Sequence, residues 1–338
     1  MKKFTLILGL LLSAFLLNGQ NTVDNLVQIG IEYHDKGEYS KAIETYKEAL
    51  QIEPKSYVVN YEIAFSYNAL GDYQNAIKYS DIAIKFGNLA NAYILKGSCL
   101  DELGRTKESI KLFEKAIKKF KNEHLLYFNL GIDYFNIGNN AKAENAFINA
   151  INVKSNHSSS HFMLGRLKNN EYQRAPSLLS LYYFLMLEPN SKRSTLAYEL
   201  LNKQLAGNVK QDTSQQKNTI NISLNSNQIK SEFGAAEMMI GLLGAAKYLD
   251  ENKDKSSEEL FVENTKSFFS VLGELKELGK NKNFWWNFYV PFFYDLAKSD
   301  YLETFCYYIS QSSNEKATKW LEENAEKLNE FQSWLLEK

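Results

Sequence analysis

The chain has 338 residues, of which 44% are hydrophobic and 23% charged, as is ordinary for a folded globular protein. Its 39 lysines and arginines are balanced by 40 aspartates and glutamates, for a net charge of -1. A protein that holds nucleic acid neutralises phosphates with an excess of basic side chains, so this balance argues against a nucleic-acid partner. The length is enough for roughly two domains.

Residues 1–20 have the pattern of a secretory signal peptide. Two lysines precede an apolar run over residues 4–17, which is too short to span a bilayer comfortably. The run ends in Asn18-Gly19-Gln20, which resembles the Gly-Gln ends of some exported proteins of Gram-negative bacteria. We therefore expect an exported protein of the periplasm or cell envelope, with no membrane span after signal removal. The alternative is an uncleaved membrane anchor.

Residues 26–54 predict two helices joined by a tight turn. Apolar and small residues recur at helical spacing from Leu26 to Tyr33, Gly37 marks the turn, and Pro54 ends a second periodic stretch. Two short helices cannot bury their apolar faces alone, so further copies must stack on them.

Copies follow at spacings of 34, 33, 34 and 34 residues. The small position of each first helix is held by Gly30, Ala64, Gly97, Gly131 and Gly165. The turn is held by Gly37, Gly71, Gly104 and Gly138, and in the fifth copy by Tyr172. One position of the second helix is held by a large aromatic residue in three copies, namely Tyr46, Phe113 and Phe147, whereas Ser80 departs from the pattern. Glycine is expected at the turns because a left-handed backbone conformation is costly for other residues.

This pattern resembles the tetratricopeptide repeat family, from residue 23 to about residue 190. The resemblance implies an all-α fold, an α-solenoid of about five helix-turn-helix repeats over residues 21–204, and a non-enzymatic scaffold that binds a protein or peptide. The fifth copy is degenerate, since Pro176 enters its second helix. Residues 178–187 are apolar on nearly all sides, so we expect that helix to be buried against something beyond the repeats.

Residues 205–227 are expected to be a linker that is polar over residues 207–218. Ile220, Ile222 and Leu224 alternate with polar residues and predict a short strand whose partner the sequence does not show.

Residues 228–338 predict a helical C-terminal domain without the repeat. Ser256 and Glu259 form a capping box for one helix, and Ser312 and Glu315 are expected to cap a single last helix.

An aromatic cluster runs from Phe284 to Tyr294 and has two interpretations. It is the core of the C-terminal domain, or it is a partly exposed platform for a glycan or peptide. Adjacent helix residues point about 100° apart, so one of Trp285 and Trp286 should meet a domain interface or solvent. The region resembles C-terminal segments of uncharacterised bacterial repeat proteins with the same Phe-Trp-Trp and Pro-Phe-Phe runs.

No enzyme motif is found, and no cofactor is expected. His157 and His161 share one helix face as a possible metal pair, but no further ligand completes a site. Cys99 and Cys306 are expected to be buried small hydrophobic residues.

The first helices of stacked repeats line a concave groove, and a stripe of their residues should face it. Val27 and Ile31 stand where the family's carboxylate-clamp members have Lys and Asn, so that specificity is not supported. The stripe is apolar enough to predict a partner-binding surface. Its predicted contact residues are Tyr61, Phe65, Ile94, Phe128, Ile132, Phe135, Phe162 and Arg166. The occupant is an external partner or the chain's own C-terminal domain.

Overall fold

The computed structural model describes residues 22–207, 209–212, 219–224, 226–279 and 282–338. The predicted signal peptide and residues 213–218 of the predicted linker lie outside these ranges. The chain divides into two compact units, Met1–Val153 and Lys154–Lys338. The division falls within the predicted repeat array, so the fifth helix pair belongs to the second unit. Among the described helices, none combines the length and apolarity needed to cross a bilayer.

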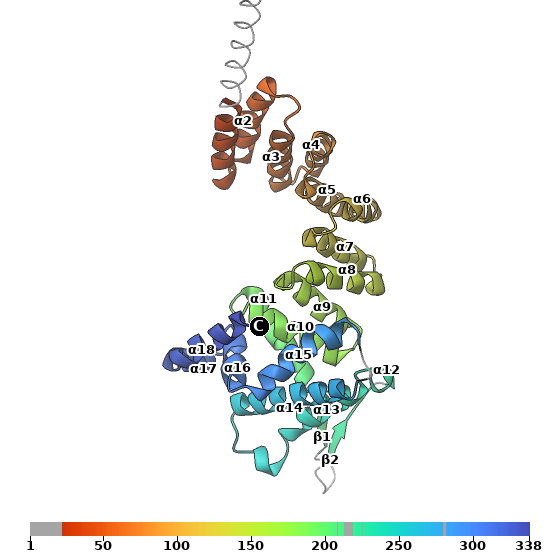
Figure 1. Cartoon of the computed structure of the whole chain (residues 1–338), viewed down its shortest axis with the longest axis vertical. Helices are drawn as coiled ribbons and strands as arrows, with labels where there is room; N and C mark the ends of the chain where they lie inside the picture. Colours follow the sequence, from red (N-terminus) through yellow and green to blue (C-terminus); the bar gives the residue numbers. More distant parts are fainter. Residues whose placement is uncertain (1–21, 208, 213–218, 225, 280–281) are drawn as a thin grey trace, which may run out of the picture. The chain divides into compact units, whose positions relative to one another are not determined.

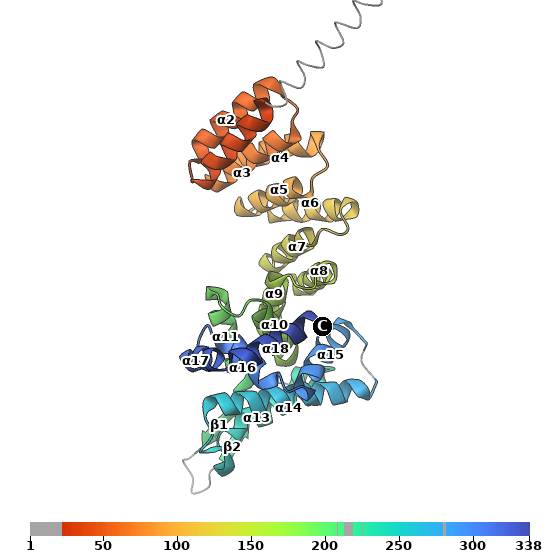
Figure 2. The same cartoon turned by 60° about the vertical axis from the view of Figure 1, so that its left-hand side comes forward.

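The first unit is a series of helix pairs (Figure 1 and Figure 2). Each helix packs against its sequence neighbours, and α3 also contacts α5, which contacts α7. The first helices of successive pairs are therefore neighbours, which is the arrangement expected of an α-solenoid of tetratricopeptide type. The helices cover residues 22–35, α2 (Tyr39–Ile52), α3 (Tyr57–Ala69), α4 (Tyr73–Phe86), α5 (Ala90–Glu102), α6 (Thr106–Lys119), α7 (His124–Asn136) and α8 (Asn140–Val153).

The predicted turn glycines all have the left-handed conformation. Their φ angles are 77° at Gly37, 76° at Gly71, 72° at Gly104 and 74° at Gly138. In the first turn, the N–H of Gly37 donates to the carbonyl of His34 at 2.8 Å, and the next N–H donates to the carbonyl of Tyr33 at 2.9 Å. These bonds close the helix end and force the positive φ, so the glycines were correctly predicted from their spacing.

The small positions face the large rings of the second helices. A Cβ atom built on Gly30 would lie 2.2 Å from the Tyr46 ring, and one on Gly131 would lie 2.6 Å from the Phe147 ring. The only alanine at this position, Ala64, belongs to the copy in which Ser80 replaces the ring. The two positions therefore vary together, because there is room for a methyl group or for a ring but not for both.

The second unit combines helices with a two-stranded antiparallel hairpin. The strands are β1 (Val209–Asp212) and β2 (Thr219–Ile222), and Val209 pairs with Ile222. The helices are α9 (Ser158–Asn170), α10 (Arg174–Leu187), α11 (Lys192–Leu205), α12 (Ser226–Lys230), α13 (Gly234–Ala246), the 3-10 helix η1 (Asp250–Asn252), α14 (Ser257–Glu277), α15 (Phe284–Lys298), α16 (Leu302–Ser310), α17 (Glu315–Glu323) and α18 (Ala325–Leu336).

The hairpin corrects the predicted linker and the unpartnered strand. The partner of β2 is β1, which lies in the polar stretch that was expected to be unstructured, and Leu224 follows β2 rather than belonging to it. The error has a physical reason: strand pairing uses backbone hydrogen bonds, and the polar residues of β1 carry no apolar alternation that would reveal it.

The helix α10 lies at the centre of the second unit, and its predicted burial is confirmed. Tyr182 is fully buried, and its ring centroid lies 4.8 Å from that of Phe269 and 6.0 Å from that of Phe293. Its hydroxyl lies 2.8 Å from the Oγ1 of Thr265 on α14. The fifth helix pair therefore shares a core with the C-terminal helices, and α10 has no surface face.

The aromatic cluster on α15 contributes to this core. Trp285 and Trp286 are both buried, so neither faces solvent. Trp286 stacks on Phe233 at 4.8 Å, and its Nε1 donates to Glu232. The Lys168 ammonium of α9 lies 5.8 Å from the ring of Trp285. The core interpretation is confirmed for both tryptophans, and Trp285 meets the fifth repeat.

The C-terminal caps agree only in part with the sequence analysis. The capping box of Ser256 and Glu259 is present at the start of α14. The predicted last helix is instead two helices, α17 and α18, interrupted at Asn324, and α17 is capped by Asn314 rather than Ser312. The Asn314 side chain accepts hydrogen bonds from two backbone N–H groups, which satisfies donors that the helix itself cannot.

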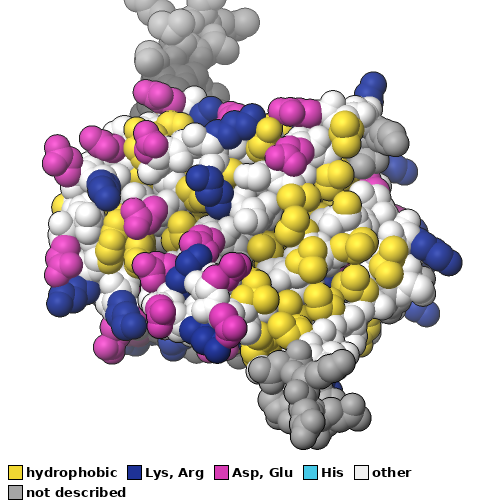
Figure 3. Space-filling model, turned by 90° about the horizontal axis from the view of Figure 1, so that it is seen from below, with side chains coloured by type: hydrophobic (Ala, Val, Ile, Leu, Met, Phe, Trp, Pro, Cys, Tyr) yellow, Lys and Arg dark blue, Asp and Glu magenta, His cyan; other side chains and the backbone are white. Residues whose placement is uncertain are grey.

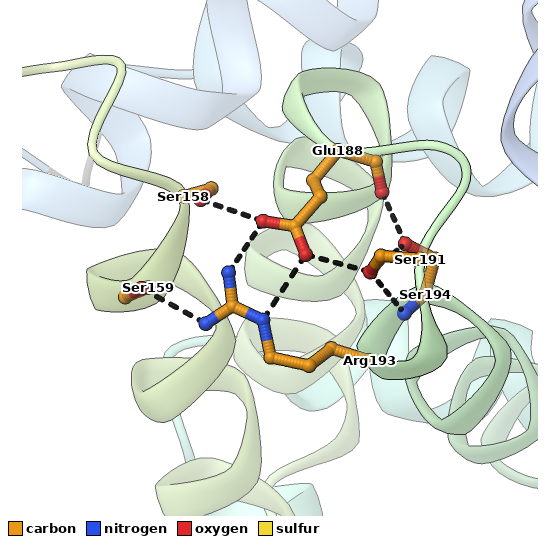
Figure 4. Close-up of polar contacts among 6 residues, drawn as sticks. All are labelled: Ser158, Ser159, Glu188, Ser191, Arg193 and Ser194. Atoms are coloured by element: carbon orange, nitrogen blue, oxygen red, sulfur yellow. Dashed lines mark hydrogen bonds and ion pairs between the residues drawn. The ribbon is translucent and has the colours of Figure 1, made fainter. Parts of the chain in front are cut away.

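A polar network joins the ends of α9, α10 and α11 (Figure 4). The Arg193 guanidinium forms an ion pair with Glu188 and donates to the hydroxyl of Ser159 at 2.9 Å. The Ser158 hydroxyl donates to the same carboxylate at 3.0 Å. Burial raises the pKa of Glu188, but these hydrogen bonds outweigh it and the pKa is lowered. The network fixes three helix ends through one carboxylate.

Candidate functional site

The predicted contact residues of the first unit lie on its neighbouring first helices. Tyr61 and Phe65 are on α3, and Ile94 is on α5. Phe65 is 40% exposed, whereas the others are half-buried. The remaining three residues of this group are Phe128, Ile132 and Phe135 on α7.

Phe65 is the centre of an aromatic stack. Its ring lies 4.7 Å from the ring of His34 with 15° between the planes, and 6.2 Å from the ring of Tyr61 with 7° between the planes. The His34 Nδ1 lies 2.9 Å from the Ser66 hydroxyl. Burial lowers the pKa of His34, so its ring is neutral at pH 7. The stack is therefore an uncharged and partly exposed aromatic surface.

Phe128 has a structural role in addition to its predicted one. Its ring centroid lies 6.0 Å from that of Phe147, the fully buried ring that faces Gly131. A substitution at Phe128 therefore also disturbs the core of its own repeat.

Phe162 and Arg166 belong to α9 in the second unit. The ring centroids of Phe162 and Phe184 lie 4.9 Å apart. The guanidinium carbons of Arg166 and Arg193 lie 5.7 Å and 5.8 Å from the centroid of the Phe162 ring. The structure thus holds Phe162 between its own repeat and two arginines. Whether these two residues act together with the other six stays a prediction.

A buried carboxyl group on α7 escaped the sequence analysis. Asp133 is 2% exposed, and burial raises its pKa to about 7. The nearby Asp101 carboxylate accepts hydrogen bonds from Thr106 at 2.5 Å and Asn136 at 3.0 Å. The sequence did offer a signal for this group, because Asp133 is a single acidic residue in the apolar pattern of the first helix of the fourth repeat.

The possible histidine metal pair is contradicted. Both ring nitrogens of His161 are occupied, Nδ1 by the Tyr289 hydroxyl at 2.7 Å and Nε2 by the Ser155 carbonyl at 2.8 Å. Burial lowers the pKa of His161 to about 3. The described residues contain no group of three or more metal-ligating side chains. Cys99 and Cys306 are buried free thiols, as expected.

A second apolar surface lies on the second unit. Met238 and Leu242 on α13 are 51% and 56% exposed, and Ile229 on α12 is 48% exposed. Figure 3, which views the structure from below, shows hydrophobic side chains gathered on one part of that face. This surface was not predicted from the sequence.

The paired helices and their turn glycines agree with two family models. A TPR repeat model matches residues 30–71, and a tetratricopeptide repeat model matches residues 90–118. The chain contains tetratricopeptide repeats. Proteins with this repeat are generally non-enzymatic scaffolds for protein interaction.

Two curated proteins share part of the tetratricopeptide region. A TPR repeat-containing protein of Methanocaldococcus jannaschii is 28% identical over 131 residues, covering 39% of this chain and 23% of that protein. Photosystem I assembly protein Ycf3 of Rippkaea orientalis is 29% identical over 104 residues, covering 27% of this chain and 60% of that protein. The chain therefore covers less than two thirds of the length of either relative.

The fold of the repeats is also similar to that of a solved structure. PilF of Pseudomonas aeruginosa matches with a TM-score of 0.50 and 20% identity, covering 55% of this chain and 85% of that chain. The type IV pilus biogenesis factor PilW matches with a TM-score of 0.47 and 17% identity, covering 68% of this chain and 96% of that chain. At this level of identity the likeness to PilF shows the fold alone.

Proposed function

We propose that the first unit binds a peptide segment of an exported partner protein on the stack of His34, Phe65 and Tyr61. The observation that supports this is Phe65, a large aromatic side chain that is 40% exposed on a first helix and lies between two further rings. Exposed aromatic groups that are already held in place lose little entropy on binding, so such surfaces are favoured in recognition.

The charges beside the stack favour a particular kind of segment. Asp35 is exposed next to His34, and Glu62 is adjacent to Tyr61. Burial raises the pKa of Glu62, and repulsion from the nearby Asp35 carboxylate raises it further. A lysine or arginine would relieve that repulsion. We therefore expect an aromatic or aliphatic anchor with a basic residue close to it.

The proposed place of action is the periplasm or cell envelope, on the pattern of residues 1–20. The partner is therefore to be sought in an envelope fraction. Residues 21–338 serve as bait, and overlapping peptides from each captured protein are then titrated against the bait by fluorescence anisotropy.

The test is Phe65→Ser. Loss of the ring should weaken binding of the best peptide by roughly tenfold or more, because an anchor of this size typically contributes more than 1 kcal/mol. Far-UV circular dichroism should be unchanged, since the removed ring is substantially exposed. Phe65→Ser is a cleaner choice than a substitution at Phe128, which packs against the core ring of Phe147.

The matched control is Met238→Ser with Leu242→Ser, which removes comparable apolar surface from α13. This variant should bind the peptide like the wild type. If it loses binding while Phe65→Ser keeps it, the peptide binds the second unit and the proposal is wrong.

A further inference from the structure

A cavity of about 460 Å³ lies in the second unit, and none of its lining residues belongs to the proposed peptide site. It is formed where α9 turns into α10, beside the end of α11 and the short helix α12. Its volume falls in the range of small-molecule sites. The lining residues are predominantly polar and include four side-chain amides, those of Asn169, Asn170, Gln204 and Gln228.

Tyr172 stands at this cavity in a strained conformation. Its φ is 59°, the only positive φ among the described residues that are not glycine, and it occupies the turn position that glycine holds in the first four repeats. Its side chain is 73% exposed, so packing does not offset the strain. Gln228 donates to the Tyr172 carbonyl at 2.8 Å and anchors the turn. What the tyrosine adds, compared with glycine, is an exposed aromatic face beside the cavity.

Two buried side chains in the cavity wall have unmet hydrogen-bonding capacity. Arg174 is 8% exposed and Gln204 is 5% exposed. The Arg174 Nη1 and the Gln204 Oε1 have no hydrogen-bond partner among the described residues. The other guanidinium nitrogens of Arg174 are held by Glu237, through its carboxylate at 2.9 Å and its carbonyl at 2.9 Å. A buried polar atom without a hydrogen-bond partner is destabilising, so a ligand that supplies the partner is favoured.

The orientation of the Gln204 amide is fixed by its neighbours. The Ser177 hydroxyl donates to the Gly165 carbonyl at 2.7 Å, so its oxygen must accept from the Gln204 Nε2 at 2.8 Å. The free atom of Gln204 is therefore an acceptor, whereas the free atom of Arg174 is a donor. A sulfate or a fully ionised phosphate brings only acceptors and cannot satisfy both. A hydroxyl group is donor and acceptor at once.

We propose that this cavity binds a single sugar unit, free or at the end of a glycan. The amides of Asn169 and Asn170 pair with ring hydroxyls, since each amide offers a donor and an acceptor. The exposed Tyr172 ring stacks on the C–H face of the sugar. The hydrogen bond from Gln228 to the Tyr172 carbonyl holds the backbone of this turn in place. Hydroxyls of the sugar satisfy Arg174 and Gln204 after a small displacement, because both free atoms are shielded from solvent.

The test uses the full chain and a panel of free sugars: glucose, galactose, mannose, N-acetylglucosamine and glucuronate, together with the methyl glycoside of each. Binding is measured by saturation-transfer NMR and by titration calorimetry. At least one sugar should bind with a dissociation constant below about 10 mM. Equal binding of the free sugar and its methyl glycoside indicates a glycan end, whereas loss of binding by the glycoside indicates a free sugar.

Tyr172→Gly separates the proposed role from a structural one. It should weaken sugar binding by roughly tenfold, because an aromatic contact is lost. It should leave the unfolding temperature unchanged or raise it, because the backbone strain is removed. Tyr172→Phe should bind like the wild type. Leu196→Ser, which changes a side chain that is 59% exposed on α11 and does not line the cavity, is the control and should also bind normally.

Two results would overturn the proposal. One is that no sugar of the panel binds the wild type, so that the cavity holds water only. The other is that a sugar binds but Tyr172→Gly binds it equally well, which places the sugar elsewhere. Neither result bears on the peptide surface of the first unit, whose test uses a different ligand and different residues.

Discussion

Asp133 is a buried carboxyl group in a position that three other repeats fill with a buried neutral side chain. Those residues are Ser66, Cys99 and Leu167, whereas the first repeat has an exposed acidic residue, Glu32. Burial raises the pKa of Asp133 to about 7, against about 3.9 in an unfolded chain. The folded state therefore binds the proton more tightly than the unfolded state. The stability that this proton gives is complete below pH 4 and is lost as the pH rises to 7.

Asp133→Asn should remove this pH dependence. Between pH 4 and pH 8 the variant should gain about 1–3 kcal/mol in unfolding free energy relative to the wild type, because asparagine has no charge to bury. Urea unfolding followed by far-UV circular dichroism measures the difference. The control is Asp24→Asn, which makes the same substitution at an exposed position. A constant difference for Asp133→Asn over this range would show that the carboxyl group is ionised in the folded state.

At the scale of the elements, contacts within one repeat could be predicted and contacts between distant segments could not. The turn glycines and the small position of Gly131 follow from a 34-residue period, because each contact joins residues close in sequence. The bonds of Tyr182 to Thr265 and of His161 to Tyr289 join residues 83 and 128 positions apart. No local periodicity encodes such pairs. The burial of α10 was predictable from its composition, but its neighbours were not.

The candidate sites show the same division. The stripe that contains Phe65 was predicted because helical periodicity fixes which face a residue occupies. The stack of Phe65 on His34 joins two repeats, so it could be predicted only from the distance between them, which the structure supplies. The cavity at Tyr172 was not predicted, although the missing turn glycine was visible in the sequence. Its wall is completed by Gln204 and Gln228, which come from segments without a repeat pattern.

The pairing of a small residue with a large ring predicts an energetic coupling. Gly131→Ala should cost about 1–3 kcal/mol, because a Cβ would lie 2.6 Å from the Phe147 ring. Phe147→Leu should cost a similar amount by leaving a cavity. The double variant should be more stable than the sum of the two losses by about 0.5–3 kcal/mol. The measurement is a double-mutant cycle of urea unfolding. Strict additivity would show that the backbone, and not the ring, dictates glycine at this position.

At the scale of the whole molecule, the buried groups of the two units respond to pH in opposite directions. In the first unit burial raises the pKa of Asp133 to about 7 and also raises the pKa of Glu62, whereas it lowers the pKa of His34. In the second unit burial lowers the pKa of His161 to about 3, below its ordinary 6.5. Its folded form binds the proton less tightly, so stability is complete above pH 6.5 and is lost as the pH falls.

Two of the other shifted carboxyl groups in the second unit, Glu188 and Glu237, act in opposite directions. The pKa of Glu188 is lowered because hydrogen bonds from Arg193 and serine hydroxyls outweigh its burial, so its stabilisation is also lost on acidification. Burial raises the pKa of Glu237 despite its contact with Arg174, and this group acts in the other direction. The shift of His161 is the larger, so the second unit should lose stability in acid.

Acidification from pH 7 to pH 4 should therefore separate the unfolding of the two units. All four tryptophans, Trp285, Trp286, Trp320 and Trp334, belong to the second unit, so tryptophan fluorescence reports that unit alone. Its urea midpoint should fall with pH, whereas the circular dichroism transition should broaden toward higher urea as the first unit persists. His161→Gln, which removes the buried imidazole, should make the fluorescence midpoint less sensitive to pH. Coincident transitions by both probes at every pH would mean that the units unfold together, and the opposing shifts would then cancel within one cooperative structure.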